Sequence, residues 1–143
     1  MKLTSPAFKH NASIPKKFTC LGEDINPALE IHDIPENAQS LALIVDDPDA
    51  PGKTWVHWVV YGIPVAARIE ENSIPGIQGY NDFGRQDWGG PCPPSGAHRY
   101  FFKIYALDIK LNLPPGQTKG QIEKVLQSHI LAQAELIGLF KVR

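Results

Sequence analysis

Two histidines, each beside aromatic residues and near a turn rich in proline, are the residues of this sequence best suited to chemistry. His57 lies within the run TWVHWVVYGIP, and His98 follows the loop GPCPPSGA and precedes the aromatic run RYFF. A third candidate, Asp47, opens the turn DPDAPG. An aspartate can fix the tautomer of a histidine or pair with its protonated form, and an imidazole can donate a hydrogen bond to an anion. Together these three residue types predict a pocket for a small anion.

Other residues nearby could complete such a pocket. Backbone N–H groups of Gly89 and Gly90 are candidate donors to the anion. Trp55, Tyr100 and the loop prolines would supply rigid apolar walls, as in most small-ligand sites.

Each candidate also has an ordinary structural explanation. Asp47 and Asp49 flank Pro48, and aspartates are common in turns because their side chains bond the backbone. His57 could be a core histidine with its hydrogen bonds satisfied, and His98 could be the exposed start of a strand. The combination therefore predicts a binding site more strongly than any one residue does.

The same residues leave a catalytic alternative open. His57 and His98 could act as general acid and base, oriented by Asp47, in a hydrolase or lyase acting on a small phosphorylated or acyl substrate. Signals for a nucleophile are weak, because Ser95 is not in a GxSxG motif and Cys92 shows no sign of activation.

Imidazole and carboxylate are also ligands for zinc and iron. The chain has no HxH or HExxH motif, however, so we expect no metal site. The phosphate-binding motifs GxGxxG and GxxxxGK[ST] are missing as well, and we expect no cofactor.

Composition excludes several classes of protein. At 143 residues, with 43% hydrophobic and 20% charged residues, the chain suits one globular domain spanning 1–143. Its 14 basic and 15 acidic residues give a net charge of −1, so no overall field draws it to nucleic acid or to an anionic membrane. Any anion must be held by local contacts.

The two cysteines, Cys20 and Cys92, are far apart in the chain and form no CxxC motif. We therefore expect free thiols in a reducing compartment. The N-terminal MKLTSPAFKHN has no apolar stretch of signal-peptide length, and no window approaches the ~20 apolar residues of a membrane span. These features predict a cytoplasmic protein.

Prolines and glycines scattered along the chain, with short apolar runs between them, indicate strands joined by turns. The run 40–47 has apolar residues on both faces and should lie centrally in a sheet. The run TWVHWVVYGIP, residues 54–64, should form a strand with Trp55, His57, Val59 and Tyr61 on one face. A third strand, 99–109, should carry Tyr100 on the face of His98 and Arg99 on the opposite face.

One helix is expected, in the sequence TKGQIEKVLQSHILA, where Thr118 is the N-cap and Gln121 completes a capping box. His129 would lie on or beside the apolar stripe of this helix. The tail AELIGLFKV favours a final short strand.

Three motifs resemble, in order and spacing, the signature segments of the phosphatidylethanolamine-binding protein family, also called the Raf kinase inhibitor protein family. They are DPDAP at 47–51, WVHW at 55–58 and GPCPPSGAHRY at 90–100. NPALEI, NDFG and HILAQAELIG resemble the bacterial and archaeal branch. The resemblance implies a mostly β fold in which a large antiparallel Greek-key sheet packs on a smaller sheet, with a few short helices, one near the C-terminus.

The resemblance also implies a surface pocket for phosphate-like groups, such as the headgroup of phosphatidylethanolamine or a nucleotide phosphate. The residues that it carries over to this pocket are Asp47, His57, Gly90 and His98, with Trp55, Pro91 and Tyr100 around them and Asp49 in the supporting turn.

Family members serve as binding modules and as inhibitors or scaffolds for kinases and proteases. We therefore expect a protein that is not an enzyme, that binds a small phosphate-bearing ligand and that modulates a partner kinase or protease. Contact with phospholipid would be peripheral at most. An exposed apolar edge on the C-terminal helix or strand would suit a homodimer.

Overall fold

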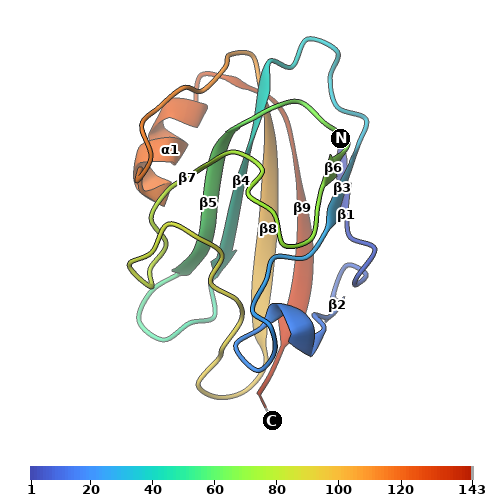
Figure 1. Cartoon of the computed structure of the whole chain (residues 1–143), viewed down its shortest axis with the longest axis vertical. Helices are drawn as coiled ribbons and strands as arrows, with labels where there is room; N and C mark the ends of the chain where they lie inside the picture. The colour runs from blue at the N-terminus through green and yellow to red at the C-terminus, as the bar shows by residue number, and fades with distance from the viewer. Residues whose placement is uncertain (143) are drawn as a thin grey trace.

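Two β-sheets and one short α-helix make up the computed structural model of the chain, which describes residues 1–142 (Figure 1). The smaller sheet has the strand order β1-β3-β6 and the larger one the order β2-β9-β8-β4-β5-β7. The elements are β1 (Lys2–Thr4), β2 (Ala12–Ser13), the 3₁₀ helix η1 (Lys16–Phe18), β3 (Leu29–His32), β4 (Ser40–Asp47), β5 (Trp55–Ile63), β6 (Arg68–Ile69), β7 (Ile77–Gln78), β8 (His98–Leu107), α1 (Lys119–Leu126) and β9 (Ile130–Phe140).

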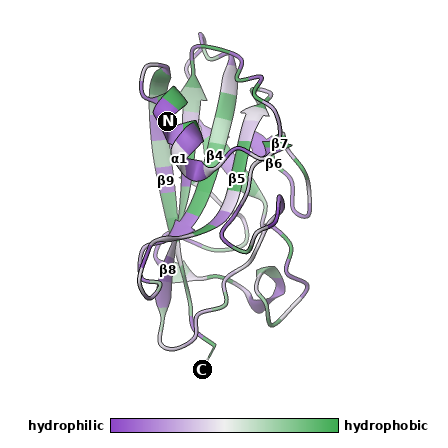
Figure 2. Ribbon diagram, turned by 90° about the vertical axis from the view of Figure 1, so that its left-hand side faces the viewer, coloured by the Kyte–Doolittle hydropathy of each residue, from purple (hydrophilic) through white to green (hydrophobic). Residues whose placement is uncertain are grey.

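Strand β4 occupies the centre of the larger sheet, between β5 and β8. All eight of its residues are buried, because apolar side chains on both of its faces are covered. The sequence pattern predicted both its bounds and its central place, and the structure confirms them. Figure 2 shows hydrophobic residues along this strand and its neighbour β5.

The larger sheet has a hydrophobic core on each face. One core lies between the two sheets and joins apolar side chains of β1, β3 and β6 to those of β4, β5, β8 and β9. The other lies under α1, where Ile122 and Leu126 pack on Ala42, Ile44 and other apolar side chains of the sheet. The expected mostly β fold, a large sheet packed on a small one, is confirmed.

One pairing departs from the expected antiparallel arrangement. The two-residue strand β2 pairs with β9 in parallel, with Ala12 opposite Gly138 and Ser13 opposite Leu139. The other pairings of the larger sheet among residues 1–142 are antiparallel.

The helix begins as predicted but ends early. The Thr118 hydroxyl accepts a hydrogen bond from the Gln121 N–H at 3.2 Å, and the Gln121 side chain accepts one from the Thr118 N–H at 2.8 Å. The capping box is therefore confirmed. The helix stops at Leu126, however, because residues from Ile130 onward pair with β8. The final strand is longer than predicted, and His129 lies in the turn before it, 2.8 Å from Asp108.

Among residues 1–142, no helix is long and apolar enough to cross a membrane.

Candidate functional site

A pocket of about 300 Å³ lies where the end of β4 meets the starts of β5 and β8. Antiparallel pairing brings these three strand ends together, since Asp47 is opposite Trp55 in β5 and Asp46 is opposite Phe101 in β8. The lining residues are Asp47, Ala50, Pro51, Trp55, His57, Phe83, Cys92, Pro93, Pro94, His98 and Tyr100. The predicted meeting of two histidines and an aspartate therefore occurs at this edge of the sheet.

Asp47 and His98 form a buried pair in this pocket. Oδ2 of Asp47 lies 2.7 Å from Nδ1 of His98, and the two residues are 3% and 7% exposed. The second oxygen, Oδ1, accepts a hydrogen bond from the Asp49 N–H at 2.7 Å. Because the carboxylate accepts, Nδ1 of His98 carries the hydrogen, and Nε2 is the ring nitrogen left for a ligand.

His57 reaches the pocket through a β-bulge. Val45 of β4 is opposite Trp58, and the next residue, Asp46, is opposite Val56, so His57 is an extra residue in β5. A bulge of this kind redirects a side chain and is common beside functional sites. The His57 ring meets the edge of Tyr100, with ring centroids 5.2 Å apart at 82°.

The bulge breaks the strict alternation that the sequence suggested for β5. Val59 and Tyr61 lie in the core under α1. His57 instead contacts Tyr100, which belongs to the core between the sheets. The prediction that His57 shares a face with Val59 and Tyr61 is therefore wrong.

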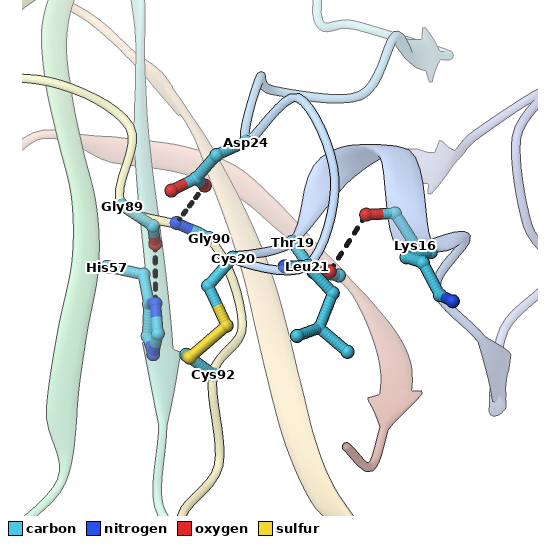
Figure 3. The surroundings of a disulfide bond; sticks show 9 residues. All are labelled: Lys16, Thr19, Cys20, Leu21, Asp24, His57, Gly89, Gly90 and Cys92. Atoms are coloured by element: carbon cyan, nitrogen blue, oxygen red, sulfur yellow. Dashed lines mark hydrogen bonds between the residues drawn. A yellow bond between two sulfur atoms is a disulfide. The ribbon is translucent and has the colours of Figure 1, made fainter. Parts of the chain in front are cut away.

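The imidazole of His57 is buried and held in one tautomer. Its Nδ1 is hydrogen-bonded to the carbonyl oxygen of Gly89 at 2.5 Å, so Nδ1 carries the hydrogen (Figure 3). Burial lowers the pKa of His57 below its ordinary value, against a smaller opposing effect of the bond to Gly89. His57 is thus held as a neutral ring whose Nε2 presents a lone pair.

Tyr100 carries a polar atom that the fold leaves unpaired. The residue is 1% exposed, and its hydroxyl has no hydrogen-bond partner among residues 1–142. Burial, and then the negative charge of Asp47, raise the pKa of this hydroxyl against a smaller opposing effect of the nearby Cys92 backbone N–H, so it stays protonated and its hydrogen lacks an acceptor. Buried hydroxyls are almost always hydrogen-bonded, so this unsatisfied donor beside the pocket is an exception.

Five of the predicted site residues line the pocket: Asp47, Trp55, His57, His98 and Tyr100. Gly90, Pro91 and Asp49 are not among the lining residues.

The backbone N–H groups expected to hold the anion have other partners. The Gly90 N–H donates to Asp24 at 2.8 Å, and the Gly89 N–H donates to the His57 carbonyl at 3.1 Å. The prediction that these two groups bind the anion is wrong, because both are used to fix the loop.

Asp49 supports the turn from outside the pocket. Its carboxylate accepts bonds from Nε and Nη2 of Arg99 at 2.9 and 2.8 Å, and from the Arg99 backbone N–H at 2.9 Å. The hydrogen bond from the Arg99 side chain is the main cause that lowers the pKa of Asp49 to about 2. The turn that follows β4 is thereby bonded to Arg99, the residue after His98.

Phe83 is a wall residue that the sequence patterns did not indicate. Its ring packs edge-on against His57 and against Trp55, with centroids 5.4 and 5.6 Å away. It lies in the segment NDFG, whose resemblance to the family was its only signal.

Cys20 and Cys92 form a disulfide beside the pocket, with an S–S distance of 2.02 Å (Figure 3). The prediction of free thiols is wrong, and the reducing compartment inferred from them loses that support. The cysteines meet because the segment 18–24 lies against the loop 88–92, where the Cys20 N–H donates to the Pro91 carbonyl at 3.2 Å.

Comparison with known proteins gives a consistent picture. The family model described as phosphatidylethanolamine-binding protein matches residues 4–141. A UPF0098 protein of Methanothermobacter thermautotrophicus is 46% identical, with 99% of each chain covered. The crystal structure of a phosphatidylethanolamine-binding protein homologue from Chlamydia trachomatis superposes with a TM-score of 0.96 at 42% identity, covering 99% of this chain and 97% of the other.

Escherichia coli YbcL, described as a new member of the mammalian family, superposes with a TM-score of 0.91 at 28% identity, covering 99% of this chain and 98% of its own. The family model spans nearly all of the sequence, and the neighbours share the fold over their full length. This chain is a member of the phosphatidylethanolamine-binding protein family.

Proposed function

We propose that this protein binds a small oxyanion, such as inorganic phosphate or the phosphate of a headgroup or nucleotide, in the pocket between β4, β5 and β8. The observation that carries the proposal is the pair of imidazoles in one small pocket, His98 fixed by Asp47 and His57 fixed by the Gly89 carbonyl, each with Nε2 left for a ligand. A phosphate has oxygens that accept from an imidazolium and, when it keeps a hydrogen, a P–OH that donates to a neutral ring.

The hydrogen positions in the pocket restrict the form of the anion. Both Nδ1 atoms are committed, that of His98 to Asp47 and that of His57 to Gly89, so both rings offer Nε2. With Nδ1 bonded to Asp47, the His98 ring can donate from Nε2 only as an imidazolium, whose charge the carboxylate would balance. Neutral His57 accepts instead, and its natural partner is a P–OH group.

A phosphate that retains one hydrogen, such as inorganic phosphate or a phosphomonoester, therefore matches this set of donors and acceptors better than a phosphodiester, which has no P–OH group. Among residues 1–142, no lysine and no arginine lines the pocket, so hydrogen bonds to the two imidazoles would supply much of the affinity. Apolar contacts from Trp55 and Phe83 suit an attached organic group.

Phosphate titration followed by NMR tests this proposal. In protein labelled with ¹⁵N-histidine, inorganic phosphate should shift the Nε2 signals of His57 and His98 and leave those of His10, which binds the backbone of Ile137, unchanged. Binding should be tighter at pH 6 than at pH 8, because an imidazolium donates to an anion through Nε2, whereas a neutral ring with its hydrogen on Nδ1 does not. Unchanged pocket signals at millimolar phosphate would contradict the proposal.

We also propose that the pocket acts with a partner protein, a kinase or a protease, as the family membership suggests. The pocket rim carries Phe83, which is 38% exposed and available to such a partner. A pull-down with wild type and with a His57→Ala, His98→Ala double variant tests this. Loss of the partner from the variant supports a role for the pocket, and equal capture places the contact elsewhere on the surface.

A hydrolase is the second candidate, favoured by the Asp47–His98 pair, which has the arrangement of an oriented general base. Turnover of a phosphomonoester, phosphodiester or acyl ester that disappears in His98→Ala and persists in His10→Ala would support it. If wild-type and His98→Ala protein hydrolyse these substrates at the same rate, this candidate fails.

A further inference from the structure

We propose that the Cys20–Cys92 disulfide is a redox-sensitive clamp on one wall of the pocket, so that a dithiol reductant weakens ligand binding while the protein stays folded. The ligand part of this inference rests on the proposed binding of an oxyanion. In the reaction, a dithiol attacks one sulfur of the disulfide, and the S–S bond breaks. The dithiol is oxidised to a disulfide. Its two electrons and two protons pass to Cys20 and Cys92, which become thiols.

The disulfide lies where a reductant can reach it and where a ligand would be affected. Both cysteines are exposed residues, and Cys92 lines the pocket. Exposed disulfides are more often reducible and regulatory than buried ones. A disulfide in this exposed position can therefore be reduced in the folded protein more easily than one buried in a core.

The clamped loop is also the loop that positions His57. The Gly89 carbonyl accepts the bond from Nδ1 of His57, and the Gly89 N–H donates to the His57 carbonyl. Cys92 follows three residues later in the same loop. A shift of this loop would therefore change both the wall at Cys92 and the hydrogen bond that fixes the His57 tautomer (Figure 3).

Close packing joins the loop to the segment that carries Cys20. The Gly90 N–H donates to Asp24, and the Trp88 indole donates to the Phe18 carbonyl at 3.2 Å. A side chain at Gly90 would have its Cβ only 2.4 Å from the Phe18 carbonyl oxygen, so the two backbones are in direct contact. These contacts do not need the disulfide, and they explain why the reduced protein should keep its fold.

After reduction, this contact depends on packing and on hydrogen bonds alone, and noncovalent contacts open more readily than a covalent bond. The loop then has more freedom, and the Gly89 carbonyl no longer holds His57 in one orientation all the time. The effect on binding is a coupling between two neighbouring sites, for which about fivefold or more in affinity is typical.

Phosphate affinity in two redox states is the first test. Inorganic phosphate is titrated calorimetrically into oxidised protein and into protein kept reduced by dithiothreitol. We expect the dissociation constant to rise about fivefold on reduction. A Cys20→Ser, Cys92→Ser double variant should bind like the reduced wild type and should not respond to dithiothreitol. Equal dissociation constants in all these samples would overturn the switch.

Amide hydrogen exchange is a second test that needs no ligand. Exchange at Gly89 and Gly90 should be faster in the reduced protein and in the double serine variant, while exchange in the centre of β4 should not change. If oxidised protein does not bind phosphate, the proposed function fails. Hydrogen exchange alone then tests whether the disulfide restrains the loop. Unchanged exchange at both glycines on reduction would overturn it.

A variant that separates the two segments while leaving the disulfide intact gives independent evidence. Gly90→Ala should weaken phosphate binding even in oxidised protein, because the added Cβ pushes against the Phe18 carbonyl and Asp24. Gly120→Ala is the matched control, since a Cβ there meets no atom within 4 Å. Equal affinity in both variants would contradict the link between this contact and the pocket.

Discussion

Asp47 and Asp46 are consecutive residues of β4 that are both buried and serve opposite faces of the sheet. Asp47 holds Nδ1 of His98 at 2.7 Å in the pocket. Asp46 lies on the other face, where its Oδ2 is 3.1 Å from Nζ of Lys103 and 2.8 Å from Nζ of Lys119. Because successive side chains of a strand point to opposite faces, Asp47 lies in the pocket, whereas Asp46 stabilises the fold through its two ion pairs.

Replacing these aspartates by asparagine separates the two roles. Asp47→Asn replaces the carboxylate that holds Nδ1 of His98 with a neutral amide, so phosphate affinity should fall about tenfold, which corresponds to about 1.4 kcal/mol. Asp46→Asn should reduce stability, because two lysines lose their buried partner, and should leave phosphate affinity unchanged. Calorimetric titration and urea unfolding of both variants measure the two effects. Similar affinity losses in both variants would contradict the assignment of Asp47 to the site.

Tyr100→Phe should have opposite effects on binding and on stability. It removes a buried hydroxyl that has no protein partner, so the free energy of unfolding should stay the same or rise by up to about 1 kcal/mol. Phosphate affinity should fall severalfold, since the ligand loses a donor.

Tyr61→Phe is the matched control for Tyr100→Phe. The Tyr61 hydroxyl donates to the Pro114 carbonyl at 2.6 Å and accepts from the Gln117 N–H at 3.2 Å. Removing it should lower the free energy of unfolding by about 1–3 kcal/mol without changing phosphate affinity. A Tyr100→Phe variant that is destabilised and binds normally would show that the hydroxyl is structural.

The stability of the protein should depend on pH through His57. Burial lowers its pKa in the folded state, so the unfolded chain takes up this proton at a higher pH than the folded one does. The free energy of unfolding should therefore fall as pH decreases through about 6.5, by up to about 1.4 kcal/mol per pH unit.

His57→Asn isolates this contribution, because an amide can still donate to the Gly89 carbonyl but does not titrate. Urea unfolding at pH 7.5 and pH 5.5 should show a smaller decrease for the variant than for wild type. The same decrease in both proteins would mean that His57 is protonated in the folded state in this range.

The disulfide should stabilise the fold as well as clamp the pocket. It joins residues separated by 72 positions, and a loop of that length implies about 4 kcal/mol of stabilisation from reduced entropy of the unfolded chain. Urea unfolding of the Cys20→Ser, Cys92→Ser double variant should show a loss of that order. A loss below about 1 kcal/mol would mean that segments 18–24 and 88–92 are close together in the unfolded chain too.

Local patterns in the sequence were sufficient for much of the fold. The bounds and central place of β4 follow from a run of eight residues whose apolar members lie on both faces. The start of α1 follows from the capping box of Thr118 and Gln121. Both features depend on neighbours in the chain. The end of α1 was predicted too late because pairing of Ile130 with β8 outweighs the helical spacing.

Five pocket residues were also identified from the sequence, through residue type and through resemblance to the family: Asp47, Trp55, His57, His98 and Tyr100. Histidine and tyrosine carry donors for an anion and aspartate can orient a histidine, so their chemistry can be read without a structure. The sequence thus determined which side chains are available to the site.

Only the tertiary structure decided how those side chains are used. The orientation of His57 comes from a bulge, which is a mismatch between two paired strands and cannot be recognised in the sequence pattern of either strand alone. The use of the Gly90 N–H by Asp24, and the meeting of Cys20 with Cys92, depend on contacts between segments far apart in the chain. Such contacts are set by packing, whereas composition and spacing specify only the groups that take part.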